Sequence, residues 1–372
     1  MFAPAGMTPL ETLIRAKIAE EGPIPVLEYM SLALGHPEHG YYMKGDPLGV
    51  DGDFVTAPEI GQVFGELIGL WSAVTWQQMG APDRTFLIEC GPGRGTLMSD
   101  LLRAAAGVPA FERTIEVHLV ETSPELRTRQ AEALSDIDPV WHDTLDTVPA
   151  GPTILIANEF IDALPIRQIV RGEEGWAERC VDATDDSLRF VAGAKTEEFA
   201  ACLPHDASPG DILEYCPAAA AFIDKLSTRL ADHPGAALFV DYGYERQAAG
   251  ETLQAVRDHA FCDPLADPGE ADLTAHVDFG ALAFKAEAHG CQTFGPVSQA
   301  AFLRSLGIVE RTASLLKNAR PEQAEAVQSA TRRLIDPSAM GILFKALAIT
   351  HPGAAPPAGF ETLSAPGTRQ DD

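Results

Sequence analysis

Residues Thr85-Phe-Leu-Ile-Glu-Cys-Gly-Pro-Gly-Arg-Gly-Thr96 decide the fold of this chain. The run 85–88 predicts a buried strand, and the apolar face of 96–106 predicts a helix that follows it directly. Three alternate glycines between them form a turn where a ligand can approach the backbone. A dinucleotide-binding turn, G-x-G-x-x-G, would need glycine at position 96, where this chain has threonine. The G-x-G-x-G spacing therefore makes a phosphate bound at the helix N-terminus less expected.

Acidic side chains flank this turn. Glu89 precedes the first glycine, and a carboxylate there suits a cationic or amino-bearing ligand and would repel a pyrophosphate. Glu121 ends the next predicted strand, 115–120, and an acid at a strand end can accept both hydroxyls of a ribose. An ordinary tight turn is the alternative for the glycines alone. The combination of strand, glycine turn, helix, strand and terminal acid predicts a nucleoside-containing cofactor.

Strands alternate with helices around this unit, which indicates a parallel sheet covered by helices. We expect strands at 115–120, 140–142, 153–157, 237–240 and 341–349, and helices at 96–106, after Ser123, and at 218–231. The two halves of this core would be 84–165 and 217–350. Residues 166–216 break the alternation and predict an inserted β-rich subdomain, with a hairpin around Gly172-Glu-Glu-Gly175. Residues 351–372 are expected to form a flexible tail.

Residues 1–83 predict a helical N-terminal extension. Capping boxes at Thr8-Pro-Leu-Glu11 and Thr56-Ala-Pro-Glu59 mark the starts of two helices. The second helix is expected to continue through Gly61, Gly65 and Gly69, which share one face. Glycine costs a helix interior about 1 kcal/mol relative to alanine. Three glycines on one face therefore predict a neighbour that packs very close.

The charge of the chain restricts its partners. It has 372 residues, 54 of them acidic and 27 Lys or Arg, for a net charge of −27. This acidity disfavours nucleic acid and anionic lipid, and it suits a basic partner or a cationic substrate group. Six scattered cysteines without a C-x-x-C pair indicate free thiols in a reducing compartment and no zinc site. No apolar run has the ~20 residues that a bilayer crossing needs.

Three motifs resemble those of one enzyme family. They are Leu87-Ile-Glu-Cys-Gly-Pro-Gly-Arg-Gly-Thr96, Val120-Glu121 and Ala157-Asn-Glu-Phe-Ile-Asp-Ala-Leu-Pro165. Further matches lie at 53–59, 64–66, 241–244 and 272–279. Over nearly its whole length, from about residue 8 to 350, the chain is similar to class I S-adenosylmethionine-dependent methyltransferases of the MidA type. That family includes the mitochondrial complex I assembly factor that methylates arginine.

The resemblance implies an α/β, Rossmann-like fold with a seven-stranded sheet and S-adenosyl-L-methionine as the cofactor. We expect no metal, because the H-x-x-H pair His36 and His39 lies in a Gly/Pro loop without further ligands. It implies that Gly91, Gly93 and Gly95 pack against the methionine part of the cofactor, that Glu89 holds its amino group, and that Glu121 binds its ribose. Asp143 is a candidate for the adenine amino group, with a solvated acid before a turn as the alternative. The implied reaction is methylation of an arginine in the quinone-site core subunit of respiratory complex I during assembly.

Asn158, Glu159 and Asp162 follow the fourth strand of the core, and ligands of open α/β sheets bind beyond the carboxyl ends of the strands. Two carboxylates three residues apart can hold a planar guanidinium, align it and accept its proton. We predict that these residues are catalytic, against the alternative that Asn158 caps the turn and Glu159 is solvated. Glu59 is a further catalytic candidate, although its first expected role is to pair with Thr56 in the capping box.

Other side chains have two interpretations each. The resemblance implies that segment 36–60 of the N-terminal extension folds over the cofactor as a lid, so that Tyr41, Tyr42 and Phe54 could line the pocket; the alternative is that they belong to the core. His276 could be a base or a structural histidine. Two other functions stay open, a non-catalytic assembly chaperone that binds the cofactor and an NAD-dependent oxidoreductase, which Thr96 argues against. No secretory signal is visible. The expected location is the cytoplasm of a bacterium, or the mitochondrial matrix if the chain is eukaryotic.

Overall fold

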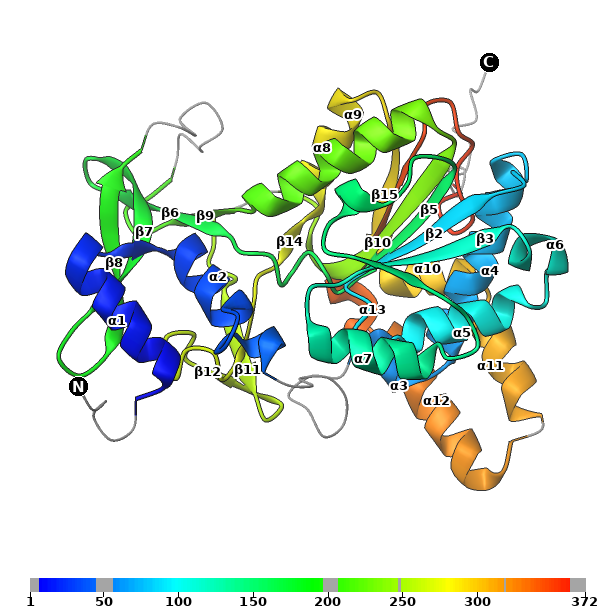
Figure 1. Cartoon of the computed structure of the whole chain (residues 1–372), viewed down its shortest axis with the longest axis horizontal. Coiled ribbons are helices and arrows are strands. Elements are labelled where there is room, and N and C mark those ends of the chain that lie inside the picture. Colours follow the sequence, from blue (N-terminus) through cyan, green and yellow to red (C-terminus); the bar gives the residue numbers. More distant parts are fainter. Residues whose placement is uncertain (1–6, 45–55, 197–206, 247–248, 318, 362–372) are drawn as a thin grey trace, which may run out of the picture.

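The computed structural model (Figure 1) describes residues 7–44, 56–196, 207–246, 249–317 and 319–361. Its main sheet has the order β15 (Gln292–Ser298), β16 (Phe344–Thr350), β10 (Gly235–Tyr244), β5 (Thr153–Asn158), β2 (Thr85–Cys90), β3 (Ile115–Val120) and β4 (Val140–His142). β16 is antiparallel to both neighbours, and the other neighbouring strands are parallel. The predicted seven-stranded, mostly parallel sheet is confirmed. The short strand β14 (Val277–Asp278) adds an eighth beside the end of β10.

Helices cover both faces of this sheet because its strands are apolar at successive positions. Phe86 and Ile88 of β2 pack on the face under α8 (Pro217–Asp232) and α9 (Phe279–Ala288), and Leu87 packs on the face under α4 (Val63–Gln78) and α5 (Thr96–Ala105). Successive residues of a strand point to opposite faces. Four more helices belong to the layer that contains α4 and α5. They are α10 (Gln299–Ser305), α11 (Ile308–Leu316), α12 (Pro321–Ile335) and α13 (Met340–Leu343). The predicted strand at 341–349 thus begins later, after α13.

The glycines of α4 lie against α5, as their shared face predicts. A Cβ on Gly65 would stand 2.5 Å from Cβ of Asp100, and one on Gly69 would stand 2.5 Å from the carbonyl oxygen of Leu101. The prediction of one long helix from residue 57 is wrong, however. The helix is split into α3 (Ala57–Ile60) and α4, because the chain is extended at Gly61.

A second lobe, at the left of Figure 1, has its own core. Its five-stranded sheet combines β1 (Ile24–Pro25) with β6 (Arg167–Gly172), β7 (Gly175–Ala183), β8 (Leu188–Lys195) and β9 (Ile212–Tyr215). The predicted hairpin is confirmed as the antiparallel pair β6 and β7. α1 (Pro9–Glu21) and α2 (Val26–Gly35) pack against this sheet. The Thr8 hydroxyl caps α1 by accepting a hydrogen bond from the Glu11 amide at 3.0 Å, as the first capping box predicts.

The second lobe also takes in a segment that the sequence assigned to the methyltransferase core. A three-stranded sheet joins β11 (Gln254–Arg257), β12 (Ala260–Cys262) and β13 (Asp272–Thr274), with β11 in the middle. Its buried residues pack with those of α1 and α2. The lobe is therefore built from three separate stretches of the chain, and the boundary of the core at 217 does not hold for residues 254–274.

Part of the predicted flexible tail is packed. Phe360 is buried, with its ring centroid 5.2 Å from that of Phe302, and the Trp71 indole N–H donates to the Ala358 carbonyl at 3.1 Å. Residues 351–361 are therefore held on the core, contrary to the expectation, and 362–372 lie outside the described residues. No described helix combines the length and apolar character that a bilayer crossing requires.

Candidate active site

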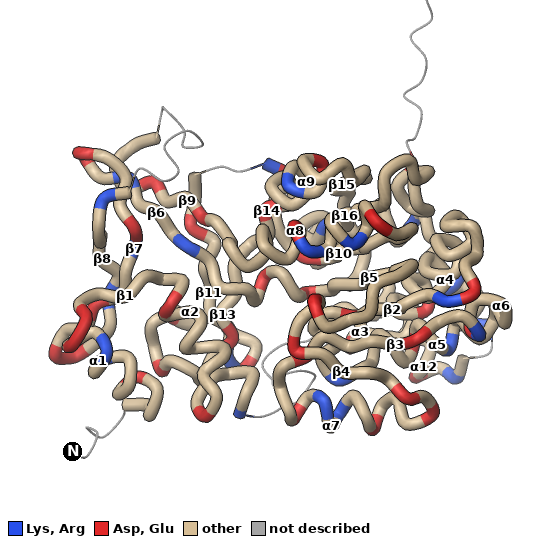
Figure 2. Tube along the Cα trace, turned by 45° about the horizontal axis from the view of Figure 1, so that its top comes forward, with Lys and Arg blue, Asp and Glu red and all other residues tan. Residues whose placement is uncertain are grey.

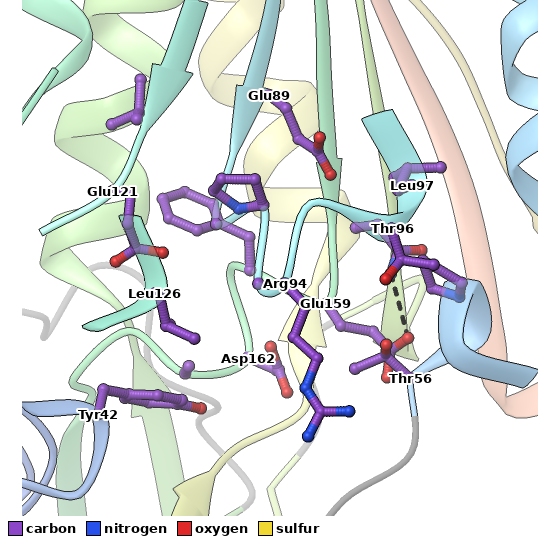
Figure 3. Close-up of a pocket in the computed structure, with 18 of the residues that line it drawn as sticks. Tyr42, Thr56, Glu89, Arg94, Thr96, Leu97, Glu121, Leu126, Glu159 and Asp162 are labelled. Atoms are coloured by element: carbon purple, nitrogen blue, oxygen red, sulfur yellow. Dashed lines mark hydrogen bonds between the residues drawn. The ribbon is translucent and has the colours of Figure 1, made fainter. Parts of the chain in front are cut away.

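A cavity of about 360 Å³ lies between the glycine turn, the ends of β3 and β5, and the second lobe. The sequence-predicted residues that line it are Tyr42, Glu59, Glu89, Gly91, Gly93, Glu121, Asp143, Asn158, Glu159 and Asp162. Figure 3 shows Glu89, Glu121, Glu159 and Asp162 around the cavity, with Tyr42 across from Glu89. These residues meet because parallel strands bring their carboxyl ends to one edge of the sheet.

The glycine turn has a backbone that only glycine adopts readily. Gly91, Gly93 and Gly95 have φ values of 65°, 53° and 83°, which side chains with a Cβ disfavour. A Cβ on Gly91 would also stand 2.9 Å from the Phe160 ring. Gly95 differs from the other two. It is not among the lining residues of the cavity, and it faces α7 (Pro124–Ala133), where a Cβ would stand 3.3 Å from Cα of Gln130.

Gln130, which the sequence analysis missed, connects the glycine turn to Glu121. Its Nε2 donates to the Gly93 carbonyl at 2.8 Å and to Glu121 Oε2 at 3.2 Å, and its Oε1 accepts from the Trp141 indole at 2.8 Å. The only hint in the sequence is its position four residues after the buried Leu126 on α7, which places both on one helix face. Burial of such an amide requires partners, and the site supplies them.

Two backbone amides fix the position of one carboxylate oxygen of Glu121. Oε1 accepts from the amides of Thr122 and Ser123, both at 2.8 Å. Burial raises the pKa of Glu121, and these hydrogen bonds work in the opposite direction. Asp143 lies nearby at the rim of the cavity with its side chain 78% exposed, paired with Arg127 Nη2 at 2.6 Å.

Glu159 and Asp162 occupy a strained turn that follows Asn158, the last residue of β5. Glu159 has φ 48°, which is rare for a residue other than glycine and marks strain. Its Oε1 accepts from the Ala57 amide at 2.8 Å and from Asn158 Nδ2 at 3.1 Å. The carboxyl therefore links the turn to the start of α3. This contact, rather than a capping box, accounts for the position of α3.

Asp241, a second residue to which the sequence analysis gave no role, binds the backbone of this turn. Its Oδ2 accepts from the backbone amides of Phe160, Ile161 and Asp162 at 3.1 to 3.3 Å, and its Oδ1 accepts from the Tyr242 amide at 2.9 Å. Burial, with Asp162 and Glu159 close by, raises the pKa of Asp241 well above its usual range. The sequence contains Asp241 in a motif match only.

Four buried polar atoms of the cavity have no hydrogen-bond partner within the described protein. They are Glu89 Oε2, Asn158 Oδ1, Glu159 Oε2 and Asp162 Oδ1. Burial raises the pKa of Glu89 and of Glu159 to about 8, and it also raises the pKa of Asp162. An unpaired buried acceptor is costly, so all four atoms suit a ligand that brings hydrogen-bond donors and positive charge.

Glu59 faces the cavity rather than its own helix start. The Thr56 side chain makes no capping hydrogen bond, so the expected capping box is wrong. Glu59 Oε1 instead accepts from the Thr96 hydroxyl at 2.5 Å, and Oε2 stands 3.8 Å from Arg94 Nη1. The threonine that replaces a dinucleotide glycine therefore ties α5 to α3.

The aromatic candidates separate in the structure. Tyr42 lines the cavity, and its hydroxyl donates to Asp272 Oδ1 at 2.8 Å, whereas Tyr41 is buried in the second-lobe core. Phe54 lies outside the described residues. His276 is not among the lining residues, and its ring packs edge-on against Tyr242. Tyr42 is thus the one candidate of this group that the structure brings to the site.

Comparisons with known proteins found a sequence family, relatives and solved structures that this chain resembles. Residues 67–297 match the sequence family described as "Putative S-adenosyl-L-methionine-dependent methyltransferase". The chain is 39% identical to the mitochondrial protein arginine methyltransferase NDUFAF7 of Xenopus laevis, over 93% of this chain and 87% of that protein, and 37% identical to that of Homo sapiens, over 92% and 83%. A crystal structure from Burkholderia thailandensis with S-adenosyl-homocysteine bound is 31% identical, with a TM-score of 0.83 over 95% of this chain and 94% of that one.

Proposed function

The chain belongs to the family of S-adenosyl-L-methionine-dependent methyltransferases, and from that premise we propose that it methylates a guanidinium nitrogen of a protein arginine. S-adenosyl-L-methionine is the cofactor of the family. The observation that carries the proposal is the Glu159 carboxyl beside the glycine turn, whose buried Oε2 lacks a partner among the described residues, together with the buried carboxyl of Asp162 three residues further along the chain. A guanidinium supplies the donors and the charge that these atoms lack.

The residues of the cavity fit the parts of the cofactor. Gly91 and Gly93 would let its methionine part lie against the turn, and Glu89 would accept a hydrogen bond from its amino group. Glu121 would accept from the ribose hydroxyls, because Gln130 and two backbone amides fix its orientation. Asp143 would receive the adenine amino group at the rim. When bound, the cofactor supplies a methyl group on a positively charged sulfur.

Glu159 and Asp162 would orient the arginine and manage its proton. The Oε1 atom of Glu159 is held by Ala57 and Asn158, which leaves Oε2 for the substrate. An arginine nitrogen is a poor nucleophile while its lone pair is delocalised, so it must be turned toward the methyl group and lose a proton. In the ligand-free cavity, burial raises the pKa of Glu159 to about 8, so its carboxyl would have to lose its proton when the cationic cofactor binds before it can accept one from the arginine.

Cofactor binding should release protons near neutral pH. The ligand-free cavity holds protons on Glu89 and Glu159, because burial raises the pKa of each to about 8. A positively charged ligand lowers these pKa values, so the bound state carries fewer protons and affinity rises with pH up to about 8, by at most about tenfold per pH unit for each proton released. Calorimetric titration with S-adenosylmethionine in two buffers of different ionisation enthalpy measures the release. Glu89→Gln should reduce it, and binding without proton release in the wild type would contradict this assignment.

For the protein substrate, we propose the core subunit of respiratory complex I that carries the quinone site, modified during assembly. The relatives whose names specify protein arginine methylation support the acceptor class. The net charge of −27 is also compatible with a basic acceptor segment. The enzyme would then act where that subunit is assembled, in the cytoplasm of a bacterium or in the mitochondrial matrix.

Mass spectrometry of that subunit tests the proposed function. A strain that lacks this chain should contain the subunit with unmodified arginine, and the wild-type gene should restore methylarginine. A gene carrying Glu159→Ala should restore complex I assembly at most partly and restore no methylarginine. Methylarginine at wild-type level in the deletion strain would refute the proposed substrate, and normal methylation with the Glu159→Ala gene would refute the role of Glu159.

A further inference from the structure

The cavity wall opposite the glycine turn belongs to the second lobe and continues outward. Asp272, the first residue of β13, lines the cavity and accepts a hydrogen bond from the Tyr42 hydroxyl. β13 pairs with β11, and β11 pairs with β12, which forms an edge of this small sheet. The active-site wall is therefore continuous with a surface that extends away from the reacting groups.

The register of this sheet aligns three side chains in a row. Asp272 stands opposite Val256 of β11, and Val256 stands opposite Phe261 of β12. Residues that oppose each other on antiparallel strands point to the same face, and adjacent strands lie about 4.8 Å apart. Phe261 therefore follows Asp272 at a distance of roughly 10 Å. We call Asp272, Val256 and Phe261 the docking row.

The docking row has a buried end and an exposed end, because Asp272 is 4% exposed whereas Phe261 is largely open to solvent. Ala255 and Leu273, which point to the other face, are 1% and 2% exposed in the second-lobe core. Phe261 is 78% exposed. One exposed aromatic residue is by itself unremarkable on a protein surface. This one stands at the outer end of a row that begins inside the active-site cavity, so a polypeptide that enters the cavity along the row would contact it.

The chain around the docking row is acidic. Residues 258–272 contain five acids and no Lys or Arg, and Figure 2 shows acidic positions around β11 and β13. Asp267 pairs with Arg257 and Glu270 pairs with Lys44. An acidic surface beside the cavity is complementary to a basic polypeptide and would guide it toward the site.

We propose that the docking row binds the substrate polypeptide, an extended basic segment whose arginine passes Asp272 into the cavity while an apolar side chain contacts Phe261. An extended chain advances about 3.3 Å per residue. The roughly 10 Å between Asp272 and Phe261 therefore places that apolar residue about three positions from the methylated arginine. This inference rests on the proposed function, because it takes arginine as the group that enters the cavity.

Peptide binding to the full chain saturated with S-adenosylhomocysteine tests the docking row. Two fluorescent peptides share a central arginine and basic flanks, and differ in carrying leucine or serine three positions to each side. By fluorescence anisotropy, the wild type should bind the leucine peptide about tenfold more tightly, and Phe261→Ala should lose this preference. Phe284→Ala is the matched control, because Phe284 is 76% exposed on α9, a helix that packs on the large sheet, and should keep the preference.

The outcomes separate this inference from the proposed function. A tenfold preference that survives Phe261→Ala, or a wild type that does not distinguish the peptides, overturns the docking row. A third peptide with norleucine in place of arginine tests the group in the cavity. Its weaker binding supports both proposals. If the norleucine peptide binds as tightly as the arginine peptide, and Phe261→Ala still removes the leucine preference, the docking row is upheld and arginine is contradicted as the acceptor.

Discussion

Glu159→Gln should lower kcat for arginine methylation by about 10²–10³-fold, the range expected when a positioned proton acceptor is removed. Glutamine keeps an oxygen for the Ala57 amide and the Asn158 side chain, so the turn and the start of α3 should stay in place. It cannot take a proton or offset the charge of a guanidinium. Single-turnover methyl transfer measures the loss, and calorimetry should find S-adenosylhomocysteine bound as in the wild type.

A surface glutamate provides the matched control. Glu125 lies in the first turn of α7 with a side chain 46% exposed, paired with Arg129. Glu125→Gln should leave both the rate and the melting temperature unchanged, because exposed ion pairs contribute little. A Glu159→Gln protein that binds the cofactor normally and keeps more than about a tenth of the wild-type rate would show that Glu159 does not act as the proton acceptor.

Asp241→Ala should destabilise the fold by about 3 kcal/mol or more and abolish activity. The four amides that donate to Asp241 would lose their acceptor, and the alanine would leave them buried without a partner. The turn that holds Glu159 in its strained conformation would relax as well. Chemical denaturation measures the stability, and methyl transfer at a temperature well below the melting transition separates lost geometry from lost folding.

Asp146→Ala is the control for this variant. Asp146 has a side chain 51% exposed and pairs with Lys225 on the surface, so its loss should cost less than about 1 kcal/mol and no activity. If Asp241→Ala keeps its activity below the melting transition, then the turn does not depend on Asp241. If its stability equals that of Asp146→Ala, the four hydrogen bonds do not hold in solution.

Local patterns predicted the parts of the fold that depend on neighbouring residues. The strand at Thr85–Cys90, the glycine turn and the helix that begins at Thr96 follow from apolar periodicity and from residues that permit unusual φ values. The close contact of α4 with α5 followed from glycine spacing. Where contacts between distant segments determine a local feature, the sequence-based prediction was wrong. The helix expected from residue 57 stops at Gly61, and the Glu59 side chain contacts Thr96 and Arg94 instead of completing a capping box with Thr56.

By itself, the sequence determined that acids and glycines gather at one edge of a parallel sheet, because a chain that alternates strands and helices brings the carboxyl ends of its strands together. Only the tertiary structure decided how these acids are held and charged. Asp241 meets the turn at 160–162 from about 80 residues away, and Gln130 reaches the glycine turn from 37 residues away. Tyr42 and Asp272 close the cavity across 230 residues. Burial, which shifts the pKa values of these carboxyls, exists only after such distant segments have packed.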